Sequence, residues 1–463
     1  MVHHPLVALP CAVLLGACGA APPPAAAPEA AQSSAPPPTA TGFVQARDQQ
    51  LWLNEQRYTF VGVNLWYGAY LAAPGDTGNL ERLRTELDLL KSSGVTNVRV
   101  LGASEDGPMK NSVKPSFRGP TDAYNAALLQ GLDVLLAELG PREMKAVIYL
   151  NNFWEWSGGM GTYLSWVNGG QFVDMADPTQ PWPAYPLFTM QFYDNVEANA
   201  LFRDYVQAVV TRTNSVTGTA YAKDPAIMAW QLANEPRPGN DTSPGHHVFP
   251  AFYRWVDETA AFIKALDPTH LVSSGNEGVM GCAGHVPCFL DAHETPHIDY
   301  LTIHVWPKNW GWLADEDMSG TLERSLARTR EYIDQHLGFA ATLGKPLVIE
   351  EFGLPRDGGS LTPGSPTVLR DRYHAALYHQ VEDSARAGGA LCGSNVWSWG
   401  GLGRAERPDG QWQTNDRQYT GDPPQEPQGL NSIFDVDTST LDVMSTHARE
   451  LREATLATAA RAD

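Results

Sequence analysis

The sequence predicts a (β/α)8 barrel with long loops at the C-terminal ends of its strands. Eight short, apolar, β-rich runs recur along the 463 residues, and segments with helical periodicity separate most of them. Polar and aromatic residues gather where these runs end. An open doubly wound sheet would also alternate strands and helices, but no G-x-G-x-x-G turn follows a strand in this chain.

The elements can be assigned in chain order, starting with a polar segment at 43–56 in which we expect a β-hairpin. Helical periodicity is clearest in 79–94, where leucines recur three and four residues apart before Gly94, and in 249–266. We expect a further helix near 196–213, inside a long segment that shapes one end of a cleft. The expected strands are 58–63, 97–101, 146–150, 227–232, 271–275, 301–305, 347–352 and 394–399.

The N-terminus has the pattern of an export signal. Residues 1–18 contain a short apolar run that ends in small residues at Cys18, which resembles a bacterial lipobox. The first five residues, MVHHP, contain no Lys or Arg, and a plain secretory peptide with an incidental Cys is the alternative. Residues 19–42 are a Pro/Ala-rich linker, and 43–463 are the barrel domain. We expect a protein exported from a bacterium, and either lipid-anchored at the cell envelope through Cys18 or secreted.

The composition excludes several classes of protein. Hydrophobic residues make up 43% of the chain and charged residues 18%, which indicates a packed core rather than global disorder. The formal net charge is -20, which argues against nucleic acid or an anionic membrane as a partner. Beyond the N-terminus no apolar run is long enough to span a membrane, so the possible anchor at Cys18 is the only membrane contact expected.

Metal and cofactor motifs are weak. Residues 293–297 read HETPH, which fits the zinc motif H-E-x-x-H, but Pro296 disfavours the continuous helix that this motif needs. His246 and His247 lie in a polar loop, where we expect them to be exposed. We therefore expect neither a metal nor a cofactor.

Three cysteines follow the signal region. Cys282 and Cys288 are close enough in sequence to bridge a loop in an oxidising compartment, and two free thiols are the alternative. Cys392 lies beside an apolar run, where we expect it to be buried and inert.

The residues at the strand ends are the main functional signal. In a barrel the C-terminal ends of the strands converge on one mouth, so residues far apart in sequence face one cleft. One exposed Trp or Glu would mean little, whereas eight strand ends that all carry such residues indicate a site. In chain order they are Asn64, Trp66, Arg99, Asn151, Trp154, Asn234, Glu235, Glu277, His304, Trp306, Glu351, Trp397 and Trp399.

Two of these residues are candidates for a reactive pair. Glu235 in QLANEPRP and Glu351 in VIEEFGLP each follow an apolar strand, where a carboxylate is costly unless it is paired or used. Simple ion pairs with Arg99 or Arg237 are the structural alternative. The functional interpretation is hydrolysis of a glycosidic bond, in which one carboxyl group is protonated and the other ionised. Arg99 could hold Glu351 ionised, and Asn234 could bond a sugar 2-hydroxyl.

These residues resemble glycoside hydrolase family 5 over roughly residues 43–455. The resemblance rests on NEP after the fourth strand, EFG after the seventh, Arg at the second, and His with an aromatic residue at the sixth. It implies a retaining barrel enzyme with Glu235 as acid/base and Glu351 as nucleophile. The segments that look most like β-mannanases of the family are 232–238, 299–312, 345–355 and 429–437.

The resemblance also implies roles for neighbouring residues. Arg237 matches an arginine that contacts sugar on the leaving-group side, and Glu277 matches a carboxylate at a similar place. Glu350 is a supporting residue whose side chain should point away by strand alternation. Many relatives carry Tyr where this chain has Trp306, and that Tyr hydroxyl usually bonds the nucleophile. Arg99, Asn234, His304 and Trp397 match other positions of the family's site.

The aromatic residues fit a polysaccharide substrate. A β-1,4-mannan chain has flat apolar sugar faces on which Trp and Tyr rings can stack, while polar groups bond its hydroxyl edges. We expect about half of the candidates to be ordinary packing residues. The candidates are Trp66, Tyr67, Trp154, Trp156, Trp306, Trp310, Trp312 and Trp399.

The leading hypothesis is a monomeric, retaining endo-β-1,4-mannanase that acts on mannan, galactomannan or glucomannan and on manno-oligosaccharides. A β-1,4-glucanase of the same family is the first alternative. A non-catalytic surface glycan-binding protein is the second, although the complete set of Glu235, Glu351, Arg99, Asn234 and His304 argues against it.

Overall fold

Eight parallel strands form the centre of the computed structural model, which describes residues 42–121, 123–240, 246–414 and 416–462. The predicted signal segment and all but the last residue of the predicted linker lie outside these residues. The chain separates into two units, residues 1–39 and 40–463, and every described helix and strand belongs to the second unit. The strands are β4 (Phe60–Asn64), β5 (Asn97–Leu101), β6 (Lys145–Tyr149), β7 (Ile227–Gln231), β8 (Leu271–Ser273), β9 (Leu301–Val305), β10 (Leu347–Phe352) and β11 (Leu391–Val396).

The strands pair in the order β8-β7-β6-β5-β4-β11-β10-β9, which is that of a nearly closed barrel. The two outer strands, β8 and β9, are joined by two backbone hydrogen bonds. Asp299 N donates to Val272 O at 2.8 Å, and His304 N donates to Glu277 O at 3.1 Å. The predicted (β/α)8 fold is therefore confirmed, and the eight strand ends meet around one mouth.

The eighth strand was predicted too late in the sequence. It runs over 391–396 rather than 394–399, because its first residues already pair with β4 and β10. Gly393 interrupts the apolar pattern there, and a Cβ at this position would lie 2.7 Å from the Phe60 ring. The glycine makes room for Phe60 inside the barrel, so a residue that looks like a strand breaker is required by packing.

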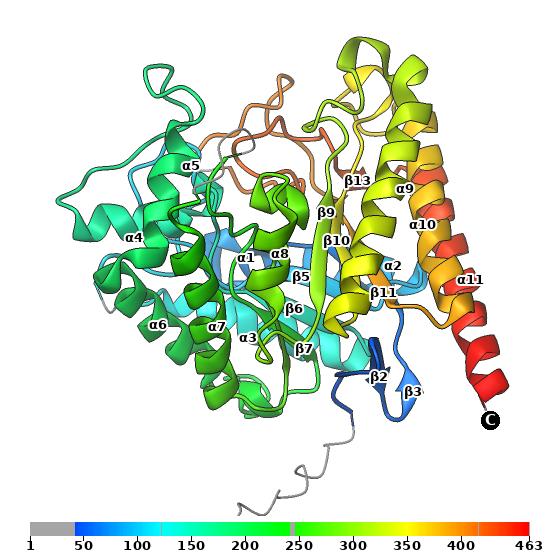
Figure 1. The fold of residues 1–463 in the computed structure, drawn as a ribbon. Helices are drawn as coiled ribbons and strands as arrows, with labels where there is room; N and C mark the ends of the chain where they lie inside the picture. Colours follow the sequence, from blue (N-terminus) through cyan, green and yellow to red (C-terminus); the bar gives the residue numbers. More distant parts are fainter. Residues whose placement is uncertain (1–41, 122, 241–245, 415, 463) are drawn as a thin grey trace, which may run out of the picture. The chain divides into compact units, whose positions relative to one another are not determined.

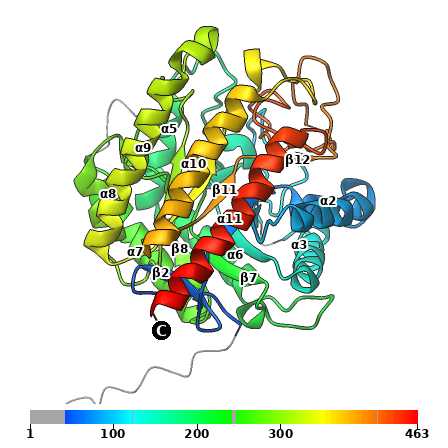
Figure 2. The same ribbon diagram turned by 90° about the vertical axis from the view of Figure 1, so that its right-hand side faces the viewer.

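Helices follow the strands and surround the barrel (Figure 1). Asn79 caps α2 by accepting a hydrogen bond from Arg82 N at 3.0 Å, and the predicted leucine stripe of this helix is buried. Figure 2 shows α10 and α11 side by side on one flank of the barrel. The helices are α1 (Gly68–Ala72), α2 (Leu80–Ser92), α3 (Ala126–Leu139), α4 (Gly159–Val167), α5 (Ala184–Thr189), α6 (Val196–Val210), α7 (Phe249–Leu266), α8 (Val286–His293), α9 (Met318–Leu343), α10 (Val368–Ala387) and α11 (Thr438–Ala462).

None of the helices in the described residues has the length and apolarity to cross a bilayer. The zinc motif is also absent as a structural unit, as predicted, because α8 ends at His293, before Pro296. His293 Nε2 instead contacts Ser274 Oγ at 2.7 Å, and His297 Nδ1 contacts Asp257 at 2.8 Å. The two histidines therefore bond to different parts of the molecule.

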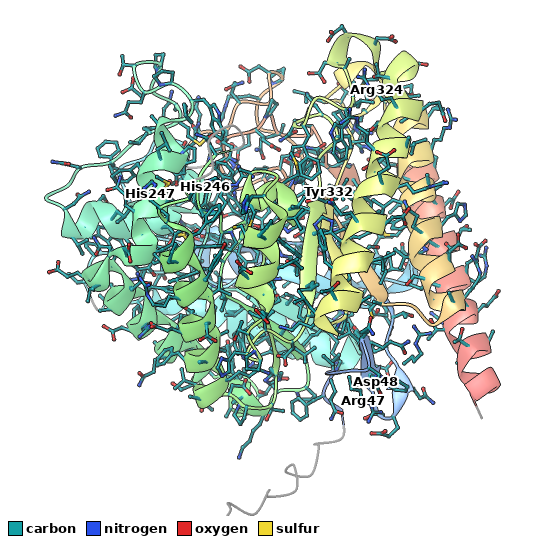
Figure 3. The ribbon with its side chains drawn as sticks, in the orientation of Figure 1. Arg47, Asp48, His246, His247, Arg324 and Tyr332 are labelled. Atoms are coloured by element: carbon teal, nitrogen blue, oxygen red, sulfur yellow. The ribbon has the colours of Figure 1, made fainter. Side chains whose placement is uncertain are left out.

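The N-terminal segment closes one end of the barrel. It forms β1 (Gln45–Arg47), β2 (Gln50–Leu53) and β3 (Gln56–Arg57), of which β1 and β2 make the predicted hairpin. Val44 and Leu51 pack there against apolar side chains from the barrel strands, including Cys392, which is buried as predicted. Figure 3 shows Arg47 and Asp48 on this hairpin, at the end opposite Tyr332. The open mouth is therefore at the C-terminal ends of the strands.

Long segments border that mouth. One connects β6 to α6, and another connects the short strands β12 (Trp399–Gly401) and β13 (Ile433–Phe434). His246 and His247 precede α7 (Figure 3), and both are exposed, as predicted.

Candidate active site

A cavity of about 360 Å³ lies where the strands end, and most of the predicted site residues line it. Ten residues predicted from the sequence contribute to its wall: Trp154, Trp156, Asn234, Glu235, Arg237, Glu277, Trp306, Trp310, Glu351 and Trp397. The β6–α6 segment contributes Trp154, Trp156, Met175 and Trp182, so it does shape the cleft as expected.

Glu235 lies in a strained turn just after β7. Its φ is +50°, a left-handed conformation that a glutamate adopts only when its surroundings require it. Glu235 N donates to Gly275 O at 2.9 Å, and a Cβ on Gly275 would lie 1.9 Å from Ala233 O. The turn after β7 therefore packs directly on backbone after β8, and this contact aims the Glu235 carboxyl group into the cavity.

Both carboxylate oxygens of Glu235 receive hydrogen bonds. His304 Nδ1 lies 2.7 Å from Oε1, and Trp154 Nε1 donates to Oε2 at 2.5 Å. His304 is fully buried at the end of β9, and Trp154 lies in the segment after β6. The carboxyl group of Glu235 is thus held by two rings from two different strand ends, which fixes its orientation.

Glu351 lies across the cavity from Glu235. Arg99 Nη1 donates to Glu351 Oε1 at 2.5 Å, and His304 Nδ1 lies 3.3 Å from Oε2. One carboxylate oxygen of Glu235 and one of Glu351 lie within 4.8 Å of each other. Retaining glycosidases place their two carboxyl groups about 5–5.5 Å apart, whereas inverting enzymes leave room for a water between them. The spacing here fits a double displacement.

Glu235 and His304 shift each other's pKa in opposite directions. Burial alone would raise the pKa of Glu235, but the hydrogen bond from His304, the charges of His304 and Arg237, and the bond from Trp154 together lower it to about 2. Burial alone would lower the pKa of His304, but the charge of Glu351 and the bonds to both glutamates raise it to about 9. The sequence pattern predicts a protonated Glu235 in the acid role, which stays a prediction. The two pKa shifts have opposite signs because His304 bridges two carboxylates.

Arg99 is the buried positive charge next to Glu351. It is fully buried on β5 and does not line the cavity. Besides Glu351, its guanidinium donates to Asn64 Oδ1 at 3.1 Å, Gln231 Oε1 at 2.8 Å and Asn234 Oδ1 at 2.8 Å. Because the Arg99 charge is held by four side chains, it orients Glu351 and Asn234 together.

Glu350 does not follow simple strand alternation. The β9–β10 pairing is irregular between Ile349 and Glu351, and such a bulge resets which face each side chain meets. Glu350 accepts hydrogen bonds from Gln231 and Tyr300, and its carboxylate lies 3.5 Å from Arg99 Nε. It is absent from the cavity wall, as expected, but it supports the Arg99 side chain instead of pointing away from the site.

Proteins of known family have sequences and structures similar to those of this chain. A family model described as glycoside hydrolase family 5 β-mannosidase-like matches residues 41–455. The chain belongs to this family. The matched residues include the whole of 43–455, over which the sequence resembles family 5, so the predicted membership is confirmed.

Three relatives show the level of similarity within the family. Mannan endo-1,4-β-mannosidase 1 of Arabidopsis thaliana is 28% identical over 378 residues, which cover 77% of this chain and 82% of the relative. Putative mannan endo-1,4-β-mannosidase 9 of Oryza sativa subsp. japonica is 31% identical over 347 residues, covering 73% and 76%. The crystal structure of a family 5 mannosidase from Rhizomucor miehei is 31% identical, with a TM-score of 0.80 and coverage of 90% of this chain and 99% of that one.

The next residues outward in this family 5 site form a connected group. Arg237 forms an ion pair with Glu277, and its guanidinium lies 5.2 Å from the centre of the Trp154 ring. Trp154 also stacks on Trp182 and Tyr185. Because Trp154 donates a hydrogen bond to Glu235, the Arg237–Glu277 pair supports the ring that orients the Glu235 carboxyl group. Their contacts with sugar, implied by the resemblance, remain a prediction.

Trp306 and Trp397 form another part of the wall. Their rings meet edge to face with centroids 6.2 Å apart. Within the described residues, Glu351 receives a hydrogen bond from Arg99, lies 3.3 Å from His304 Nδ1, and receives no hydrogen bond from Trp306. The bond that a tyrosine hydroxyl supplies in many relatives is therefore not replaced by the Trp306 indole.

The prediction that Trp66 binds substrate does not agree with its position. Trp66 is fully buried, and its Nε1 donates to Gly421 O at 2.8 Å. Its ring packs against Trp156 and Tyr419, so it anchors the β12–β13 connection. A tryptophan two residues past a strand end can face inward or outward, and only the packing of the following segment decides which. Among the other aromatic candidates, Tyr67 and Trp399 are also fully buried core residues.

The β12–β13 connection contributes residues that were not predicted from the sequence. Pro423, Gln425 and Glu426 line the cavity, although no strand end lies near them. Glu426 Oε2 is buried without a hydrogen-bond partner. Burial, together with the charges of Asp422, Glu351 and Glu235, raises the pKa of Glu426 to about 8. Glu426 lies between prolines in a loop, and this local sequence does not indicate a buried carboxyl group in the cavity wall.

Replacing Glu426 should change how stability depends on pH. Because its folded pKa lies above the ordinary value, Glu426 favours the folded state less and less as pH rises toward about 8. We expect Glu426→Gln to unfold like the wild type near pH ~3, below the ordinary pKa of a glutamate, and to be the more stable protein near pH ~9, above the folded pKa. Thermal unfolding at both pH values measures this. An equal loss of stability in the wild type and the variant between these pH values would contradict the raised pKa of Glu426 in the folded protein.

Glu235, His304 and Glu351 also offer three donor atoms close enough together for a cation. The Arg99 guanidinium lies 2.5 Å from Glu351 and opposes a second positive charge there. This charge makes a cation site at these three side chains unfavourable.

Proposed function

We propose that the chain is a retaining endo-β-1,4-mannanase that hydrolyses internal β-1,4-mannosidic bonds of mannan, galactomannan or glucomannan. The observation that carries this proposal is the spacing of Glu235 and Glu351 across a cavity at the barrel mouth. The Arabidopsis and rice relatives named as mannan endo-1,4-β-mannosidases support the choice of mannan.

In the first step, Glu351 attacks the anomeric carbon and the bond to the glycosidic oxygen breaks. Arg99 donates a hydrogen bond to Glu351 Oε1 at 2.5 Å and orients this carboxyl group for the attack. As the new bond forms, the Glu351 carboxylate loses its negative charge, and this charge is the largest contribution that raises the His304 pKa. The proton on Nδ1 then becomes easier to release to Glu235 Oε1, 2.7 Å away, and from Glu235 to the departing oxygen.

In the second step, water replaces the departed sugar. Glu235 accepts a proton from this water, whose oxygen attacks the anomeric carbon and releases Glu351. Two displacements at the same carbon retain its configuration. The ring of Trp154, which donates to Glu235 Oε2, keeps the carboxyl group in place through both steps.

Substrate choice is tested by comparing polysaccharides. Galactomannan and carboxymethylcellulose differ in stereochemistry at C2, so we expect reducing-end release from the first and little from the second. Equal or greater release from carboxymethylcellulose would favour the β-1,4-glucanase alternative. Calorimetric binding of galactomannan with no release from either polymer would favour a glycan-binding protein.

An exo-acting β-mannosidase is a second candidate. The matching family model is described as β-mannosidase-like, and the Rhizomucor miehei structure at TM-score 0.80 is titled a mannosidase. Mannohexaose separates the two modes. An endo-mannanase gives mannobiose and mannotriose early, whereas a β-mannosidase gives mannose and mannopentaose first.

Export remains part of the proposal and rests on residues 1–18 alone. We propose that the protein reaches the cell envelope or the medium, with Cys18 as a possible lipid attachment site. Fractionation of cells that express the full chain and a Cys18→Ser variant measures this. Equal release of both proteins into the medium would support the plain secretory alternative.

A further inference from the structure

Two buried thiols lie against each other beside the wall of the active site. The sulfur atoms of Cys282 and Cys288 are 2.7 Å apart, and both side chains are fully buried. Cys282 ends a short 3-10 helix, Val279–Cys282, that follows β8, and Cys288 lies in the first turn of α8. From this contact we propose that Cys282 and Cys288 form a disulfide, and that this bond fixes the Arg237–Glu277 pair in the cleft.

A tight turn brings the two sulfurs together. Ala283 and Gly284 between them both have positive φ, +52° and +77°, which reverses the chain. His285 N donates to Cys282 O at 2.9 Å, and Cys288 N donates to His285 Nδ1 at 3.1 Å. An alanine in the left-handed region is strained, so the turn needs interactions that hold it closed. A covalent link across its base would do so.

The turn is connected to the active site through backbone. Glu277 lies five residues before Cys282 and pairs with Arg237 in the cavity wall. Tyr332 OH donates to Glu277 O at 2.8 Å and accepts from Met280 N at 3.2 Å, which clamps the backbone between Glu277 and the turn (Figure 3). His336 Nε2 also accepts from Val279 N at 2.9 Å. A shift of the cysteine turn would therefore move Glu277, then Arg237, and then the Trp154 ring that bonds Glu235.

The bond forms by thiol–disulfide exchange with a small-molecule or protein disulfide as oxidant. The thiolate of one cysteine attacks the oxidant disulfide, forming a mixed disulfide and releasing one thiol of the oxidant. The second cysteine then displaces the other thiol, so two cysteine thiols are oxidised while the oxidant disulfide is reduced to two thiols. Because both sulfurs are buried in the folded chain, this exchange occurs before the turn closes.

Peptide mapping of the full chain tests the bond without reference to activity. The protein, exposed to oxidised glutathione during refolding, is unfolded in a thiol-alkylating reagent and digested with trypsin. We expect the peptide 265–308, which contains both cysteines, to be unlabelled, lighter than the dithiol by two hydrogen atoms, and doubly labelled only after reduction. The peptide 387–404 supplies the internal control, because its one cysteine, Cys392, takes a label with or without reduction. Double labelling of 265–308 before reduction would overturn the proposal.

The effect on the cleft rests on the proposed function and is measured separately. We expect reduction to lower the melting temperature of the wild type by a few degrees and to raise its KM for mannohexaose about threefold, with less change in kcat. The Cys282→Ser, Cys288→Ser double variant should have the melting temperature and KM of the reduced wild type, and reductant should change neither. The Cys392→Ser variant should behave like the wild type. If the peptide map shows the disulfide but reduction leaves the KM of the enzyme unchanged, the proposed effect of the disulfide on the cleft is refuted. Absence of mannan hydrolysis in all forms would instead refute the proposed function, with the peptide map unaffected.

Discussion

Replacing Glu351 should abolish turnover while leaving the fold intact. Without the nucleophile no glycosyl-enzyme forms, so we expect Glu351→Ala and Glu351→Gln to lower kcat on galactomannan by about 10⁴-fold or more. Reducing-end release measures this loss. Arg99 would lose its closest carboxylate partner in Glu351→Ala, whereas the amide oxygen of Glu351→Gln can still accept its hydrogen bond.

The pair of variants therefore separates chemistry from stability. We expect Glu351→Gln to melt near the wild-type temperature and Glu351→Ala below it, with both equally inactive. With an aryl β-mannoside and azide, the Glu351→Ala variant should give an α-mannosyl azide, because the anion takes the place of the missing nucleophile. Near-normal turnover by either variant would end the proposed mechanism.

Replacing Glu235 should produce a loss that depends on the leaving group. We expect Glu235→Ala to lower kcat/KM on galactomannan by about 10²–10⁴-fold, because the departing sugar oxygen needs a proton. An aryl mannoside with an acidic phenol needs no such help, so its first step should be nearly unchanged and the glycosyl-enzyme should accumulate. Burst kinetics with the aryl mannoside measures this accumulation.

The reaction with azide again distinguishes the role of Glu235 from that of Glu351. In Glu235→Ala it should accelerate the second step and yield a β-mannosyl azide, opposite in configuration to the product expected from Glu351→Ala. Equal loss on polysaccharide and aryl mannoside in Glu235→Ala would contradict its role as acid/base.

Much of the site could be predicted because barrel topology relates sequence position to location. Glu235, Glu351, Asn234 and Trp397 lie at strand ends, and parallel strands carry them to one mouth whatever the intervening sequence. Trp66 obeys the same rule of position and yet packs into the core. The position of a residue relative to a strand therefore predicts at which end of the barrel the residue lies. It does not predict where the side chain of a residue in the following loop points.

Local periodicity and strand-end chemistry are properties of neighbouring residues, so the amino-acid sequence was sufficient to predict the barrel and the two glutamates that meet at its mouth. Long-range packing instead raises the pKa of His304, makes Glu350 a support for Arg99, and brings Glu426 to the edge of the cavity. These features depend on distances between residues that are far apart in the chain. The strength of a charge interaction and the burial of a group depend on those distances, and the distances cannot be read from any single segment of the sequence.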